Sequence, residues 1–180
     1  DVKAPWGTSG VLSLKGGAKF GMRTCSVVVK LTKLQPATSF EFLATLTGHD
    51  APLSGFFATF PPAGGRTRFT MAVSSCLGFF PLMPLWPLRQ MLPTDITFLI
   101  GDAIYADLPW SLGQPYEDLY LRLTQDHSFK ILTSLSPLFS MYDDHEVSDN
   151  WDKGTEQPWP QAIGNWTAFL GSRNPPKVSR

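Results

Sequence analysis

The sequence is poor in the features that mark several classes of protein. Among its 180 residues it has only two cysteines, Cys25 and Cys76, which can form at most one disulfide, so a disulfide-rich scaffold is excluded. Charged residues make up 17% of the chain, and 15 Lys and Arg residues balance 15 Asp and Glu residues. With a net charge of zero, the chain offers no general positive field for nucleic acid or an anionic membrane, although a small anionic substrate is compatible with it.

The sequence also lacks a long uninterrupted apolar run. Residues 78–88 are its most apolar stretch, but this stretch is about half the length of a membrane-spanning helix and contains three prolines. We therefore expect neither a transmembrane segment nor a membrane partner. Because the sequence carries no signal-peptide pattern, the cellular compartment cannot be read from it.

What the sequence does contain is enough hydrophobic and aromatic residues for a core, at 43% and 13%, and many turn formers, at 15 glycines and 16 prolines. The turn-rich segment 61–66 predicts a domain boundary, which divides the chain into domains 1–66 and 67–180. The first domain carries short runs of β-branched and aromatic residues separated by turns, which predict a small antiparallel β-sandwich. These predicted strands are residues 26–31, 39–46 and 55–60.

The second domain has an α/β pattern. Apolar runs lie far apart at residues 68–75, 96–101 and 138–142, and each predicts a strand. Between the last two, apolar and aromatic residues recur at helical spacing over 116–123, which predicts an amphipathic helix. The tail 156–180 contains four prolines and is predicted to be poorly ordered.

Each predicted strand of the second domain is followed by residues of the types that bind metal ions. Cys76 follows the first strand, Asp102, Tyr105 and Asp107 follow the second, and the run Asp-Asp-His-Glu at 143–146 follows the third. Because ligand sites in open α/β sheets lie beyond the carboxyl ends of parallel strands, we expect these residues to converge. Taken singly, each also has a structural explanation: a capping carboxylate, a buried aromatic or thiol, or a solvated acidic loop.

The segments 69–76, 98–107 and 142–151 resemble, in order and spacing, the metal-binding blocks of the PhoD-like alkaline phosphatase D family. Residues 34–40 and 57–61 are similar to parts of the fibronectin-III-like module that precedes the catalytic domain in this family. The resemblance implies a small fibronectin-III-like antiparallel β-sandwich followed by a partial α/β metallophosphatase domain of the four-layer α/β/β/α type.

The resemblance implies metal-binding roles for five residues. Asp102 would bridge two metal ions, and Cys76 and Tyr105 would complete a ferric site. Asp144 stands where related enzymes carry a metal-binding Asn, and Asn150 is a weaker candidate for the second metal. The implied cofactors are Fe3+ and a divalent cation such as Ca2+, and a Tyr and Cys pair suits ferric iron.

His145 is the implied catalytic residue, because it stands where related enzymes carry the histidine that faces the substrate. Its carboxylate neighbours would keep it protonated or orient it for proton transfer. The implied activity is that of an alkaline phosphatase or phosphodiesterase, in which metal-activated water hydrolyses a phosphate monoester or diester. The implied partner is a phosphate-ester substrate, in agreement with the absence of a nucleic-acid or membrane partner expected from the composition. The compartment stays unknown, although proteins of this family are often exported.

The family's pattern continues with further Asp and His ligands, whereas this sequence ends at Arg180. Its other histidines, His49 and His127, lie in no matching block, and the candidate ligands are too few for two complete metal sites. We therefore expect an amino-terminal portion of a phosphatase, whose own activity is an open question. The alternative is a non-catalytic β-sandwich binding module with a degenerate α/β remnant.

Overall fold

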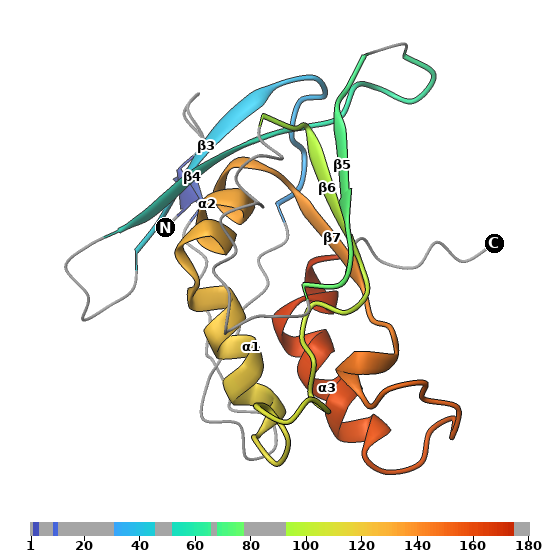
Figure 1. The fold of residues 1–180 in the computed structure, drawn as a ribbon. Helices are drawn as coiled ribbons and strands as arrows, with labels where there is room; N and C mark the ends of the chain where they lie inside the picture. The colour runs from blue at the N-terminus through green and yellow to red at the C-terminus, as the bar shows by residue number, and fades with distance from the viewer. Residues whose placement is uncertain are drawn as a thin grey trace. The chain divides into compact units, whose positions relative to one another are not determined.

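The computed structural model divides the chain into two compact units, Asp1–Phe69 and Thr70–Arg180 (Figure 1). The residues that the structure describes are 2–3, 9–10, 31–45, 52–65, 68–77 and 93–174. Cys25, His49 and the apolar stretch 78–88 lie outside these segments. Within the described segments, no helix is both long enough and apolar enough to cross a membrane.

The first unit contains antiparallel strand pairs in its described residues. β1 (Val2–Lys3) pairs with β2 (Ser9–Gly10), and β3 (Ser39–Ala44) pairs with β4 (Leu53–Ala58). In the longer pair, Phe40 lies opposite Phe57, and the two rings stack with their centroids 5.4 Å apart. Aromatic pairs of this kind stabilise neighbouring strands, which explains why these two segments pair.

β3 and β4 confirm the strands predicted within residues 39–46 and 55–60, although β4 begins two residues earlier than predicted. The remaining predicted strand, at 26–31, lies outside the described residues except for Leu31, which is not in a strand. The fibronectin-III-like sandwich therefore stays a prediction.

The second unit is built on a parallel sheet with the strand order β5-β6-β7 (Figure 1). β5 spans Met71–Ser74, β6 spans Ile96–Ile100 and β7 spans Leu138–Met141, which confirms the strands predicted in this part of the chain. Successive side chains of a strand point to opposite faces of the sheet. Leu99 is accordingly 1% exposed and packs into the core of the unit, whereas the next residue, Ile100, is 44% exposed.

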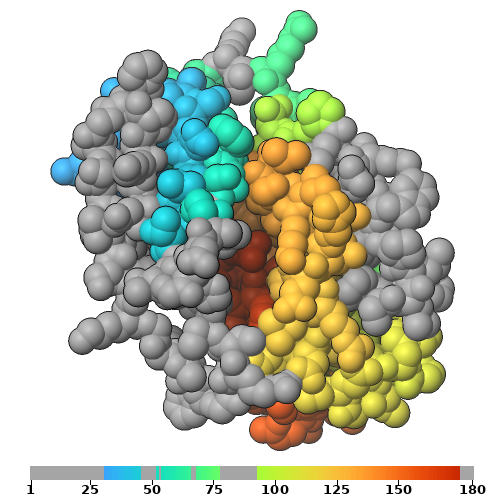
Figure 2. All heavy atoms as spheres, turned by 90° about the vertical axis from the view of Figure 1, so that its left-hand side faces the viewer, coloured from blue at the N-terminus to red at the C-terminus, as the bar shows by residue number. Residues whose placement is uncertain are grey.

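Helices cover the face of the sheet on which Leu99 lies. α1 (Tyr116–Gln125) confirms the helical pattern predicted at 116–123, and α2 (His127–Leu135) follows it directly. Figure 2 shows the atoms of α1 in yellow and those of α2 in orange, adjoining each other on one face of the molecule. Asp126 lies between them and caps α2, because its Oδ1 accepts hydrogen bonds from the N–H groups of Ser128 (2.8 Å) and Phe129 (3.0 Å). The buried core includes Leu99, Leu119, Tyr120, Leu123, Phe129, Leu132 and Leu138.

α3 (Trp159–Phe169) shows that the prediction of a poorly ordered tail at 156–180 is wrong over this range. Pro158 and Pro160 lie at the start of the helix, where a missing N–H breaks no helical hydrogen bond. Ala162 within the helix is fully buried, and Leu170 at its end joins the core of the unit. These prolines therefore mark the beginning of a packed helix. Residues 175–180 lie outside the described segments.

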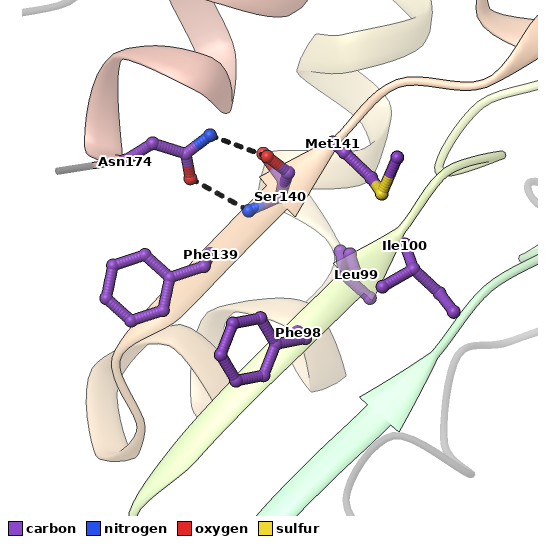
Figure 3. Close-up of a pocket in the computed structure, with 7 residues that line it drawn as sticks. All are labelled: Phe98, Leu99, Ile100, Phe139, Ser140, Met141 and Asn174. Carbon is purple, nitrogen blue, oxygen red and sulfur yellow. Dashed lines mark hydrogen bonds between the residues drawn. The ribbon is translucent and has the colours of Figure 1, made fainter. Parts of the chain in front are cut away.

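The other face of the parallel sheet carries exposed apolar side chains. Phe98 and Phe139 lie there with their ring centroids 5.5 Å apart and line a groove of about 460 Å³ (Figure 3). Among the described residues this face stays partly exposed, although both faces of parallel sheets are normally covered. Several large apolar side chains on this face are between 44% and 54% exposed, namely Met71, Val73, Ile100 and Met141.

The outer edge of β7 is occupied by a side chain. Asn174 donates a hydrogen bond from Nδ2 to the carbonyl oxygen of Ser140 (2.6 Å), and its Oδ1 accepts one from the N–H of Ser140 (2.9 Å) (Figure 3). These are the backbone groups that a further strand would use. Asn174 thus satisfies the hydrogen-bonding groups of Ser140 at the edge of the sheet.

Candidate metal centre

The carboxyl ends of β6 and β7 bring two loops together. The register of the strands places Ile100 beside Met141, so the loops that follow begin at the same level of the sheet. Gly101 allows them to approach, because its φ is +94° and an added Cβ would lie only 2.4 Å from the Cβ of Asp143. The predicted convergence of Asp102 with the run 143–146 follows from this contact.

Left-handed backbone conformations recur among the candidate ligands. The φ angles are +55° at Cys76, +55° at Asp102 and +54° at Asn150. Such angles are uncommon for residues other than glycine, and they persist where the surrounding structure holds them in place. The backbone at these three positions is thus shaped by its contacts and not by local preference alone.

Asp102 lies at the centre of the site and is 6% exposed. Its Oδ2 accepts hydrogen bonds from the hydroxyl of Tyr105 (3.2 Å) and the thiol of Cys76 (3.4 Å). Its Oδ1 is buried and has no hydrogen-bond partner among the described residues. Because a buried carboxylate oxygen without a partner is costly, this atom fits a site for a cation.

Asp144 and His145 complete a group that could hold a metal ion. One carboxylate oxygen each from Asp102 and Asp144 and one ring nitrogen of His145 all lie within 4.8 Å of one another. Cys76 and Tyr105 join this group through their hydrogen bonds to Asp102. Carboxylate and imidazole donors suit divalent first-row metals, and a phenol or thiol adds a preference for a more polarising ion.

The Tyr105 hydroxyl is protonated in this arrangement and acts as a donor. Burial raises the pKa of Tyr105 well above its ordinary value of 10, and the hydrogen bonds and charges of Cys76 and Asp102 raise it further. The negative charge of Asp102 therefore disfavours a phenolate. A bound cation would act in the opposite direction, because it favours the ionised form of any ligand beside it.

Asn150 lies at the rim of the group. Its backbone N–H donates a hydrogen bond to Oδ2 of Asp144, whereas its side-chain Nδ2 donates to Oδ2 of Asp149 (2.9 Å). The side chain of Asn150 is exposed. The structure thus brings the backbone of this predicted ligand to Asp144 and bonds its side-chain amide elsewhere.

His145 is held by a carboxylate that the sequence analysis places at a strand end without assigning it a role. The Nδ1 atom of His145 lies 2.9 Å and 3.1 Å from the two carboxylate oxygens of Asp107. The imidazole also stacks on the ring of Tyr105, with centroids 4.1 Å apart. Asp107 itself accepts a hydrogen bond from the N–H of Asp149. The ring orientation of His145 is therefore determined from two sides.

The same contacts set the charge of His145. Burial acts to lower the pKa of His145, but the hydrogen bond and charge of Asp107, together with the charges of Asp102 and Asp144, outweigh it. The net effect raises the pKa above its ordinary value of 6.5. The imidazole is thus more readily protonated than a free histidine and suited to donate a proton.

Glu146 connects the two loops, a role for which the sequence analysis gives no prediction. It is fully buried, and its carboxylate accepts hydrogen bonds from the backbone N–H groups of Asp102, Ala103, Ile104 and Asp143. Burial raises the pKa of Glu146 to about 7, and the N–H groups that bond to it act in the opposite direction. In the sequence Glu146 stands three residues after Asp143, which is the spacing of a capping box and could have indicated its bond to the N–H of Asp143. Nothing local identifies its partners at residues 102–104.

Comparison with protein-family models and with curated proteins gives no match. A solved structure of PhoD is similar to this chain, with a TM-score of 0.55 and 21% sequence identity over 76% of this chain. The chain spans 30% of the length of that PhoD chain. The likeness concerns the fold: the chain has a mixed α/β structure compatible with part of the PhoD fold, with a potential metal-binding cluster at the ends of its parallel strands.

Proposed function

We propose that this chain is a portion of a metal-dependent phosphoesterase related to PhoD-like alkaline phosphatases. The observation that carries the proposal is the group of Asp102, Asp144 and His145, in which Oδ1 of Asp102 is buried without a partner among the described residues. The similarity of the fold to PhoD supports the same assignment. Because the chain spans 30% of the PhoD chain, hydrolysis is proposed for the protein as a whole and metal binding for this chain.

The proposal extends to the domains. Residues 1–66 would form a fibronectin-III-like β-sandwich, which the antiparallel pair β3 and β4 supports. Residues 67–180 would form part of a four-layer α/β/β/α domain. The parallel sheet supports this, because helices cover one of its faces while the opposite face is apolar and exposed, as expected for a layer that packs on a second sheet.

The proposed ligands surround Asp102. Cys76 and Tyr105 both bond to Oδ2 of this residue, so a ferric ion bound by the three would replace two hydrogen bonds by coordination. Asp144 and Asn150 would hold a divalent cation such as Ca2+, to which Asp102 would also contribute, and the Asn150 amide would then leave Asp149. When bound, such a pair of metal ions supplies an activated water and stabilises charge on the phosphoryl oxygens.

His145 lies in the group that could hold a metal ion, but it is proposed as the general acid and not as a metal ligand. Asp107 holds its Nδ1, which leaves Nε2, 3.7 Å from Oδ1 of Asp149, to face the leaving-group oxygen of a phosphate monoester or diester. The raised pKa of His145 favours the protonated ring near neutral pH, as a proton donor requires. Asp107 would then stabilise the imidazolium before the proton moves.

The test compares Asp102→Asn with Asp152→Asn. Both remove one carboxylate charge, but Asp102 lies in the cluster whereas Asp152 is exposed. We expect Asp102→Asn to lower metal affinity by at least about 10-fold, and Asp152→Asn to leave it unchanged. Metal content is measured by mass spectrometry after incubation with Fe3+ and Ca2+, and hydrolysis is measured with bis-p-nitrophenyl phosphate.

The outcomes separate the two candidate functions. Metal binding that depends on Asp102 supports the phosphoesterase, and turnover by this chain would extend the activity to it. A chain that binds no metal ion would overturn the proposal and favour the non-catalytic binding module.

A further inference from the structure

The Glu146 side chain is unusual because its carboxylate is completely buried and both of its oxygens accept hydrogen bonds. Glutamate is rarely fully buried unless its charge is paired, and here backbone N–H groups take the place of a cation. Oε2 accepts from the N–H groups of Asp102 (3.0 Å) and Asp143 (2.8 Å). Oε1 accepts from those of Ala103 (2.6 Å) and Ile104 (3.3 Å). One side chain therefore satisfies two separate stretches of backbone.

These donors belong to the two loops that deliver the candidate ligands. Three consecutive N–H groups come from Asp102–Ile104, directly after β6, and the fourth comes from Asp143, directly before Asp144. Asp102 stands at a φ of +55°, a conformation that needs support from outside its own loop. The carboxylate of Glu146 provides it by linking residues more than 40 positions apart.

We propose that Glu146 is a positioning residue for the metal centre. Its carboxylate holds the backbone of Asp102 against that of Asp143, and so sets the separation between the carboxylates of Asp102 and Asp144. The inference rests on the metal centre proposed above. It assigns Glu146 no contact with metal or substrate.

The position requires a carboxylate for a reason of hydrogen-bond chemistry. A carboxylate offers two oxygens that only accept, and each accepts from two N–H groups here. A glutamine side chain at this position would have the same shape but one oxygen and one amino group. In either orientation of the amide, two of the backbone N–H groups would then face another donor, and the loop would have to shift.

The experiment is a titration with Co2+ at pH 8, followed by the visible absorption of the bound ion, on folded protein well below its unfolding temperature. We expect Glu146→Gln to bind Co2+ at least about 10-fold more weakly than the unaltered chain, with altered absorption bands, because the supporting shell of a metal site affects affinity to this extent. Glu156→Gln makes the same chemical change at an exposed position and should alter neither the affinity nor the bands.

The readout separates positioning from a purely structural role. If Glu146 only stabilised the fold, Glu146→Gln would lower the unfolding temperature while the folded protein kept the same affinity and bands, and the proposal would be overturned. If the unaltered chain bound no Co2+, the metal centre itself would fail instead. These two failures are distinguishable in the same titration.

A second measurement needs no substitution and so does not depend on whether Glu146→Gln folds. In the unaltered, metal-free chain, hydrogen exchange followed by NMR should show protected amides at Asp102, Ala103, Ile104 and Asp143, although all four lie outside regular strands. Exchange as rapid as that of solvent-exposed loop amides would refute the inference, because Glu146 would then not be holding these groups.

Discussion

Replacing Gly101 with alanine measures how closely the two ligand loops approach each other. At a φ of +94°, alanine carries a conformational cost of about 1–2 kcal/mol. The added methyl group would also lie 2.4 Å from the Cβ of Asp143, far inside van der Waals contact, and overpacking of this kind costs about 1–3 kcal/mol. We therefore expect Gly101→Ala to lower the free energy of unfolding by about 2–5 kcal/mol.

Other glycines of the same unit separate the two contributions. Gly113 also has a positive φ, +78°, but an added Cβ would meet no described atom within 4 Å, so Gly113→Ala should show the conformational cost alone. Gly164 lies within α3 with equally open space around it, and alanine there should stabilise the chain by up to about 1 kcal/mol. Unfolding in urea, followed by circular dichroism at constant m-value, gives all three free energies.

The comparison between Gly101→Ala and Gly113→Ala decides the question. If the two substitutions cost the same, the methyl group at position 101 meets no close neighbour, and the described approach of the loops is incorrect. A loss at position 101 that exceeds the loss at 113 by more than about 1 kcal/mol, the lower limit of the overpacking cost, supports it.

Two further predictions concern the charge and the core of the second unit. Because the pKa of His145 is raised above 6.5, the stability that its charged form contributes is fully present below pH 6.5 and is lost as the pH rises through the raised value. Asp107→Asn should lower the pKa of His145 in an NMR titration and weaken this pH dependence of urea unfolding; an unchanged pKa would contradict the Asp107 contact. Leu99→Ala should cost about 2–5 kcal/mol in the same unfolding assay, because Leu99 is 1% exposed. Ile100→Ala on the open face should cost less than half of that, and equal losses would mean that both faces of the sheet are packed.

The strands and α1 could be predicted because their signals are local. Apolar runs of five to eight residues, bounded by turn residues, contain or overlap β3 to β7. The helical spacing of apolar and aromatic residues at 116–123 indicates which face of α1 is buried. The sequence does not predict α3, because proline is compatible with two opposite structures. It breaks a helix from within, but it is favourable in the first turn of one. Only the packing of Ala162 and Leu170 decides between them.

The candidate site could be predicted in its residue types but not in its connections. Cys76, Asp102 and Tyr105 follow strands, and their meeting depends only on parallel strands ending at one edge. The pairing of Asp107 with His145 and that of Glu146 with the backbone of residues 102–104 are different, because the partners lie 38 and more than 40 positions apart in the chain. No local spacing encodes such pairs.

By itself, the sequence determined which segments form strands and which residue types stand at their ends. The reason is that the spacing of apolar residues along a segment depends on which face of that segment is buried. Only the tertiary structure decided that Asp107 orients His145 and that Glu146 joins the loops of Asp102 and Asp143. The physical reason is the register of β6 on β7, which pairs Ile100 with Met141. That register starts both loops at one level, and the missing side chain of Gly101 lets them touch.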